Sequence, residues 1–143
     1  MRQIKKIIIH CTTSSDDKNA EYHIIIHKDG SCQNNIPESN IAKHLKDHNR
    51  NSIGIAWVGP GEITLEQKKT LDSTIRRILK IYDISINDIY GHYELCTGKT
   101  CPNLDMDGLR KSIRTEEYLP DGPSDDEIEI SLIDIENQVL GED

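Results

Sequence analysis

The segment from Ser52 to Gly59, with the sequence SIGIAWVG, is apolar on both of the faces that an extended chain presents. A strand of this kind is covered on two sides, so we expect it at the centre of a sheet. Its glycine, Gly54, would admit a close neighbour. A second short run, Ile4 to His10, is rich in β-branched residues and precedes turn-forming residues, which favours another buried strand. These two runs predict a layered fold around a central sheet.

A hairpin and a long helix are predicted between and after these strands. Asp29-Gly30 supplies a turn with positive φ between the apolar run Tyr22–His27 and residues 31–35. Thr64 followed three residues later by Gln67 matches a helix-capping box. The helix that it begins has one apolar stripe, formed by Leu71, Ile75, Ile78, Leu79 and Tyr82.

Two further elements complete the predicted fold. Residues 87–90 suit a short strand that leads into Gly91-His92, and Asp105 can cap a final helix that runs to about Arg114. We therefore predict an α/β fold of a single domain, in which helices flank a central mixed β-sheet. In such sheets the ligand site usually lies at the C-terminal ends of the strands.

The charge of the chain is unevenly distributed. Residues 120–143 contain nine acidic residues and no basic one, which leaves 16 of the 25 acidic residues and all 17 basic residues in residues 1–119. The net charge of −8 therefore belongs to a C-terminal tail, and the charge of the body argues neither for nor against nucleic acid. Neither a membrane span nor a signal peptide is evident, so we expect cytoplasmic synthesis without a signal peptide.

A possible metal site is centred on the stretch from Gly91 to Asp105. It contains His92 and Cys101, and imidazole and thiolate are ligands that zinc prefers. A third candidate ligand is His10, at the end of the first predicted strand, although a solvated histidine is the commoner outcome for a lone residue of this kind. The alternative for the stretch is a disulfide between Cys96 and Cys101. Free thiols and one metal ligand are the favoured interpretation, because a chain of this length needs no disulfide.

Several segments together resemble one enzyme family. In the family's order they are Ile7–Thr13, Tyr22–Gly30, His48–Ile55 and Gly91–Asp105, within about residues 4 to 114. The family is the zinc-dependent N-acetylmuramoyl-L-alanine amidases of type 2, which includes small phage lysozyme-amidases and the peptidoglycan recognition proteins. Four motifs in register are far more specific than one motif.

The resemblance assigns roles to six residues. It implies that His10, His92 and Cys101 are zinc ligands, with water at the fourth, open position of a catalytic site. It also implies that Tyr22 orients or deprotonates the attacking water and that Lys99 stabilises the oxyanion that develops on the substrate carbonyl. His44 falls where some members have a histidine in the substrate groove, so the resemblance suggests a substrate contact.

The sequence departs from the family between His10 and Tyr22. Members of the family generally have a helix of a dozen or more residues there, which forms one wall of the substrate groove. The eleven residues from Cys11 to Glu21 are too few for that helix and its connections. We therefore predict a zinc amidase domain over residues 1–119 with a shortened, more open groove, and an acidic tail over residues 120–143.

Three hypotheses for function follow from these residues. The first is a zinc amidohydrolase that cleaves the bond between N-acetylmuramic acid and L-alanine in peptidoglycan or muropeptides. The second is a module of the same fold that binds muramyl peptide without cutting it. The third is a structural zinc site closed by Cys11 or Cys96 as a fourth protein ligand.

The partners and the place of action follow from the first hypothesis. The expected partner is peptidoglycan or a muropeptide, with no nucleic acid and no membrane, and the expected state is a monomer. The substrate lies outside the membrane, which suggests an endolysin of a phage or mobile element that a separate pore releases to the cell wall. An enzyme that acts in the cytosol on recycled wall fragments is the alternative.

Overall fold

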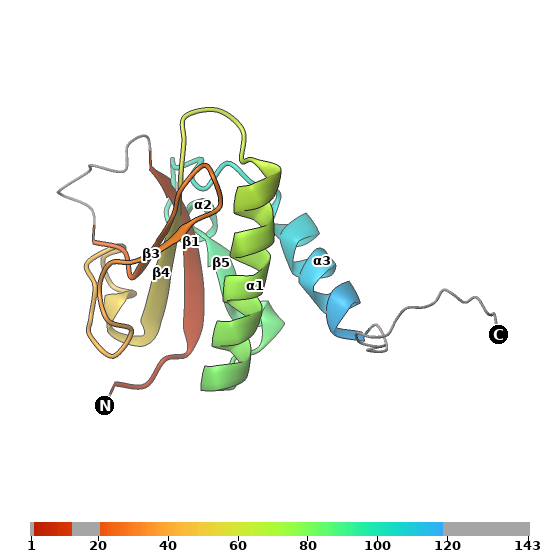
Figure 1. The fold of residues 1–143 in the computed structure, drawn as a ribbon. Coiled ribbons are helices and arrows are strands. Elements are labelled where there is room, and N and C mark those ends of the chain that lie inside the picture. The colour runs from red at the N-terminus through yellow and green to blue at the C-terminus, as the bar shows by residue number, and fades with distance from the viewer. Residues whose placement is uncertain (1, 13–20, 119–143) are drawn as a thin grey trace. The chain divides into compact units, whose positions relative to one another are not determined.

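The computed structural model of the chain describes residues 2–12 and 21–118, and it gives side chains for residues 2–12 and 21–114 (Figure 1). Its strands form one five-stranded sheet in the order β3-β2-β4-β1-β5. The strands are β1 (Lys6–Thr12), β2 (Ile24–Ile26), β3 (Cys32–Asn34), β4 (Ser52–Val58) and β5 (Ile89–Gly91). The helices are η1 (Asn49–Asn51), α1 (Leu65–Tyr82), η2 (Ile86–Asp88), α2 (His92–Leu95) and α3 (Met106–Tyr118).

The sheet is mixed, as predicted. β1 pairs in parallel with β4 and with β5, and β2 pairs in parallel with β4, whereas β2 and β3 form an antiparallel hairpin. Every residue of β4 is buried, which agrees with its apolar character on both faces and with its place in the sheet. The prediction of an α/β fold with a central mixed sheet is therefore confirmed.

The first strand lies two residues further along the chain than predicted. It begins at Lys6 rather than Ile4 and continues to Thr12, because its pairing with β4 extends as far as the partners Thr12 and Val58. His10 is therefore the third residue from the end of β1 rather than its final residue. Its partner in β4 is Ala56, so both side chains project to the same face of the sheet.

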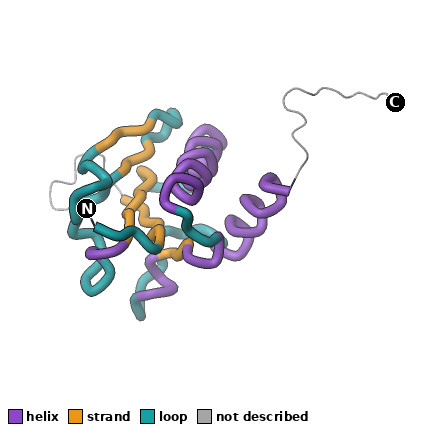
Figure 2. Tube along the Cα trace, turned by 90° about the horizontal axis from the view of Figure 1, so that it is seen from below, coloured by secondary structure: helices purple, strands orange, loops and turns teal. Residues whose placement is uncertain are grey.

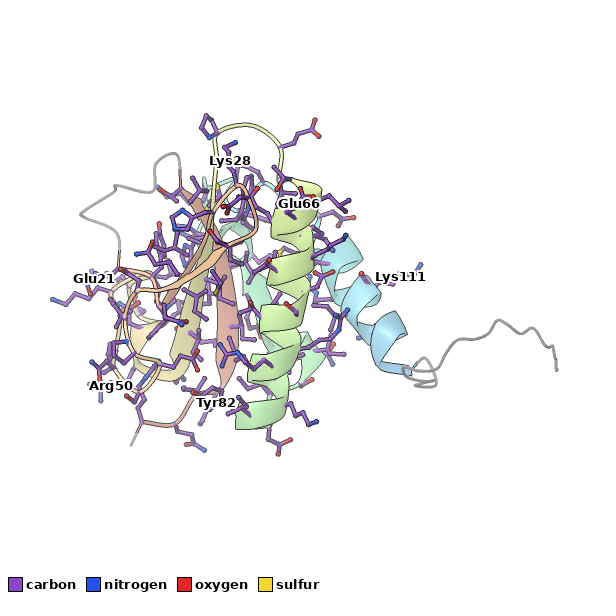
Figure 3. All side chains as sticks on the ribbon, in the orientation of Figure 1. Glu21, Lys28, Arg50, Glu66, Tyr82 and Lys111 are labelled. Carbon is purple, nitrogen blue, oxygen red and sulfur yellow. The ribbon has the colours of Figure 1, made fainter. Side chains whose placement is uncertain are left out.

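The hairpin from β2 to β3 has the predicted turn. Gly30 has a φ of +89°, and a Cβ at this position would lie 2.9 Å from the Cβ of Glu66 in α1. Only glycine combines this backbone conformation with so close a neighbour. The tip of the hairpin thus lies against the first turn of α1, where Lys28 and Glu66 are both seen (Figure 3).

Helix α1 lies along one side of the strands, as the view from below shows (Figure 2). The predicted capping box is present, because the Thr64 side chain accepts from the backbone N–H of Gln67 and the Gln67 side chain accepts from the backbone N–H of Thr64. The amide of Gln67 also donates to the carbonyls of Val58 (2.9 Å) and Ile26 (3.3 Å). One buried side chain thus caps α1 and joins it to the ends of β4 and β2.

The C-terminal part of the chain divides within α3. One compact unit extends to Arg110 and a second unit begins at Lys111. The last helix is longer than the predicted span to Arg114, since it ends at Tyr118. The predicted acidic tail, residues 120–143, lies outside the described residues, so the boundary at residue 119 stays a prediction. In the described part of the chain, no helix has both the length and the hydropathy that crossing a bilayer requires.

Candidate metal centre

Three side chains predicted as zinc ligands lie together at one end of the sheet. One nitrogen of His10, one nitrogen of His92 and the sulfur of Cys101 all lie within 4.8 Å of one another. β1 and β5 are parallel neighbours, so the C-terminal part of β1, which carries His10, lies beside the end of β5. His92 is the first residue of α2, directly after β5, and Cys101 lies on the loop that follows α2.

The loop that carries Cys101 is fixed by contacts to its neighbours. The backbone carbonyl of Cys101 accepts a hydrogen bond from the backbone N–H of Tyr93 at 2.8 Å. The indole N–H of Trp57 donates to the carbonyl of Pro102 at 2.9 Å. Gly91 permits this approach, because a Cβ there would lie 2.9 Å from the Cδ of Pro102 and 2.7 Å from the Cγ of Met106. Glycine at the end of β5 therefore lets the cysteine loop pack against it.

Both imidazoles of the cluster are set up to stay neutral. Burial lowers the pKa of His10 well below its usual value, and the neighbouring His44 and His92 lower it further. Burial and then the charge of Lys99 lower the pKa of His92. A neutral imidazole has the lone pair that a metal ion requires. The Nε2 atom of His92 is buried and has no hydrogen-bond partner within the described residues, which leaves this ring with unused bonding capacity.

The environment of Cys101 also suits a cation. Burial raises the pKa of its thiol to about 12, although the backbone N–H of Cys11, whose nitrogen lies 2.8 Å from the Cys101 sulfur, acts in the opposite direction. A divalent cation beside the sulfur would stabilise the thiolate and offset the effect of burial. Two neutral imidazoles and one thiolate are a donor set that zinc prefers, so the residues present fit a zinc ion.

No fourth protein ligand joins the cluster among residues 2–12 and 21–114. Cys11 and Cys96, the two candidates for closing a structural zinc site, are both outside it. The Cys11 sulfur instead accepts from the side-chain amide of Asn103 at 3.3 Å. All four cysteines are free, so the alternative disulfide between Cys96 and Cys101 is not formed. Three protein ligands with an open position are the arrangement of a catalytic zinc site.

The predicted catalytic residues Tyr22 and Lys99 both lie near the cluster. The ring of Tyr22 is 5.1 Å from the ring of His10, measured between centroids. Lys99 is exposed. Its positive charge adds to burial in lowering the pKa of His92, and it opposes the effect of burial on the pKa of Cys101. The roles assigned to these two residues remain predictions, which their positions support.

His44 contacts a member of the cluster, His10, directly. Its Nδ1 lies 2.9 Å from the Nε2 of His10, and its own Nε2 lies 3.0 Å from the hydroxyl of Ser52. Gly54 provides the space, because a Cβ at Gly54 would lie 2.5 Å from the Cγ of His44. Burial lowers the pKa of His44 to about 3, so its ring is neutral near pH 7.

The family resemblance suggested a substrate contact for His44, and nothing in the sequence indicated a role for Ser52. His44 and His48 have helical spacing, yet the structure places them on irregular chain with different partners, since His48 lies 2.8 Å from the Lys6 ammonium. Gly54 was the available signal, because it predicted a close neighbour without saying which residue fills the space. The substrate contact assigned to His44 stays a prediction.

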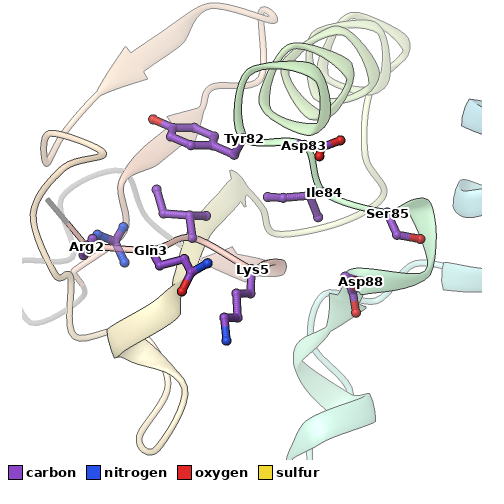
Figure 4. A pocket seen from close by; sticks show the side chains of 9 residues that line it. Arg2, Gln3, Lys5, Tyr82, Asp83, Ile84, Ser85 and Asp88 are labelled. Atoms are coloured by element: carbon purple, nitrogen blue, oxygen red, sulfur yellow. The ribbon is translucent and has the colours of Figure 1, made fainter.

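A hollow of about 590 Å³ lies away from this cluster, at the N-terminal end of β1 (Figure 4). Residues that precede β1 form one wall, and the last turn of α1 with the segment after it forms the other. Arg2, which lines it, already donates to the backbone carbonyls of Glu38 and Ser52. The hollow thus has no group resembling the cluster of His10, His92 and Cys101.

Comparisons with known proteins agree with this geometry. A family model described as N-acetylmuramoyl-L-alanine amidase matches residues 1–104. The endolysin of Escherichia phage T7 is 26% identical over 125 residues, which cover 70% of this chain and 81% of that protein. The endolysin of Enterobacteria phage T3 matches with the same identity and coverage.

Solved structures share the fold. N-acetylmuramoyl-L-alanine amidase LysC from Clostridium intestinale URNW superposes with a TM-score of 0.71 and 21% identity, covering 79% of this chain and 87% of that one. The Ph2119 endolysin from a Thermus scotoductus MAT2119 bacteriophage superposes with a TM-score of 0.65 and 20% identity, covering 79% and 86%. At these identities the likeness is one of fold.

Proposed function

Because the chain belongs to the N-acetylmuramoyl-L-alanine amidase family, we propose that it is a zinc-dependent hydrolase of peptidoglycan. The bond cleaved is the amide between the lactyl group of N-acetylmuramic acid and L-alanine. One observation carries the zinc dependence: the approach of His10, His92 and Cys101 to within 4.8 Å of one another, with no fourth ligand among the described residues. This is the donor set and the open geometry that a hydrolytic zinc site needs.

The residues around the cluster divide the chemistry between them. Zinc bound there would polarise the amide carbonyl and make water more acidic. Tyr22, whose ring lies beside the ring of His10, orients the attacking water or, as a phenolate, deprotonates it. The ammonium of Lys99 stabilises the negative charge that develops on the carbonyl oxygen. Its exposure gives it the freedom to reach a bound substrate.

The endolysin names of the relatives favour intact cell wall as the substrate. We expect the protein to release stem peptides from sacculi as well as from small muropeptides. Digestion of the two substrates in parallel separates a lytic role from a recycling role, because an enzyme of wall recycling would act on the muropeptides alone.

A variant of one ligand tests the proposal. Cys101→Ala removes the thiolate, so we expect the bound zinc to fall from about one per chain to near zero and the release of stem peptides to fall at least about 100-fold. Metal analysis and an assay of new amino groups on purified cell walls measure the two effects. Cys96→Ala is the matched control, because Cys96 lies on the same loop and outside the cluster.

Two results would count against the proposal. Full activity in Cys101→Ala would exclude this cluster as the catalytic centre. Bound zinc without any hydrolysis by the unaltered protein would instead support a module that binds muramyl peptide without cutting it.

A further inference from the structure

A chain of hydrogen bonds leads from the metal cluster into the body of the protein. It begins at Nε2 of His10, which lies 2.9 Å from Nδ1 of His44. It continues from Nε2 of His44 to the hydroxyl of Ser52 at 3.0 Å, and from that hydroxyl to the backbone carbonyl of His48 at 2.6 Å. Every member is partly or fully buried, so each polar group needs a hydrogen-bond partner within the protein.

The last bond sets the direction of all the others. The carbonyl of His48 only accepts, so the single proton of the Ser52 hydroxyl is used there, and the Ser52 oxygen must accept from His44. A neutral His44 has one N–H, which is then on Nε2, and its Nδ1 is an acceptor. The Nε2 of His10 must therefore carry the proton that it donates to His44.

This direction determines which nitrogen of His10 is available to a metal. A neutral imidazole protonated at Nε2 has its lone pair on Nδ1. The opposite tautomer of His10 would place two lone pairs against each other at 2.9 Å unless the His44 ring also changed its tautomer. In that case Nε2 of His44 would be an acceptor facing Ser52. The one proton of the Ser52 hydroxyl would then have two competing acceptors, Nε2 of His44 and the carbonyl of His48.

The position of His44 is itself fixed by packing. Its ring fills the space left by Gly54, and its backbone N–H donates to the side-chain carbonyl of Asn49 at 3.0 Å. The ring of His23, fully buried, lies 5.9 Å away in an edge-on arrangement. The His23 tautomer is also fixed, because its Nδ1 accepts from the backbone N–H of Gly54 at 3.0 Å.

We propose that His44 and Ser52 are positioning residues of the metal centre, which fix the tautomer of His10 so that its Nδ1 is the metal ligand. The inference rests on the proposed zinc site and adds residues that contact the ligand rather than the ion. Groups that hydrogen-bond a metal-bound histidine orient the ring and raise its basicity, and their loss typically weakens metal affinity about 10-fold to 100-fold.

A matched pair of substitutions at His44 tests this role. His44→Leu removes the acceptor. In His44→Asn the new side chain has nearly the same shape as leucine, but it keeps an oxygen where Nδ1 of His44 stood. We expect zinc affinity, measured by competition with a chromophoric chelator, to fall about 10-fold to 100-fold in His44→Leu. In His44→Asn the loss should be several-fold smaller. Ser52→Ala, which frees the His44 tautomer without altering the contact to His10, should give a loss between wild type and His44→Leu.

The tautomers can also be observed without any substitution. In the full-length, metal-free protein at pH 7, the ring ¹⁵N chemical shifts of His10 and His44 should both show the proton on Nε2. This readout separates the two proposals, because it does not depend on zinc binding or on hydrolysis. It also stands if a variant fails to fold.

Three results would overturn the inference. They are a His10 ring protonated at Nδ1, unchanged zinc affinity in folded His44→Leu, and equal losses in the Leu and Asn variants. Failure of the unaltered protein to bind zinc would contradict the proposed function, while the ¹⁵N shifts would still decide the direction of the hydrogen-bond chain.

Discussion

Gly54 has no Cβ, and a Cβ there would lie 2.5 Å from the Cγ of His44. We therefore expect Gly54→Ala to push the imidazole away from β4 and to cost about 1 to 3 kcal/mol of unfolding free energy, as overpacking of a buried site does. Urea unfolding of the full chain measures this cost. Gly54→Ala should also weaken zinc binding, because the hydrogen bond from His10 to His44 would be lengthened.

A double variant shows whether the clash with His44 is the cause. Adding His44→Ala to Gly54→Ala empties the contested space, so the double variant should lose less stability than the sum of the two single variants. Additive losses would mean that the alanine at position 54 acts through the strand rather than through His44.

At this scale the sequence predicted which candidate ligands lie together better than it predicted their surroundings. His10, His92 and Cys101 were recognisable because imidazoles that follow apolar strands and a nearby thiol form a known donor set, and the structure brings them together. The hydrogen bonds of His44 were not predictable, because they join residues on irregular chain whose path depends on tertiary packing. Ser52 had no signal of its own, since a serine at the start of a strand is common.

Among the secondary-structure elements, those with a strong local pattern were predicted well. The capping box at Thr64 and Gln67 begins α1, and the turn at Gly30 joins β2 to β3. The boundaries of β1 were displaced by two residues, because they depend on pairing with β4 rather than on the sequence of β1 alone. The segment between β3 and β4, which carries His44, had no periodic pattern from which to predict it.

Contacts from α1 hold that segment in place. The carboxylate of Glu38 accepts hydrogen bonds from Arg77 and from Tyr82, each at 2.8 Å, and both donors belong to α1. Burial alone would raise the pKa of Glu38, but the hydrogen bonds from Arg77 and Tyr82 outweigh it, so the pKa is lowered from its usual value of 4.5. The ionised carboxylate therefore stabilises the fold.

This shift predicts a pH-dependent stability difference. The pKa of Glu38 is lower in the folded state, so its stabilisation is fully present above pH 4.5 and is lost as the pH falls through the folded-state value. Glu38→Gln should cost on the order of 1 kcal/mol at pH 7, since Arg77 is partly exposed, and less at pH 3. Urea unfolding at the two pH values gives the difference, with the exposed Glu62→Gln as the control. A cost that does not change with pH would mean that the charge of Glu38 is not involved.

On the scale of the whole molecule, family membership and fold agree with the sequence, whereas the groove is still a prediction. The family model covers residues 1–104, which include the three proposed ligands. The short connection between His10 and Tyr22 makes a more open groove the expectation, yet residues 13–20 lie outside the part of the chain that the structure describes.

The central claim is that one zinc ion in the cluster of His10, His92 and Cys101 supports cleavage of the muramoyl amide. Zinc titration of chelator-treated protein tests it most directly, with the newly exposed amino group of L-alanine on purified sacculi as the readout. The account predicts no cleavage without metal and a rise in rate that levels off at about one zinc per chain. Cleavage that persists after zinc is removed, or new reducing sugar ends in place of amino groups, would contradict it.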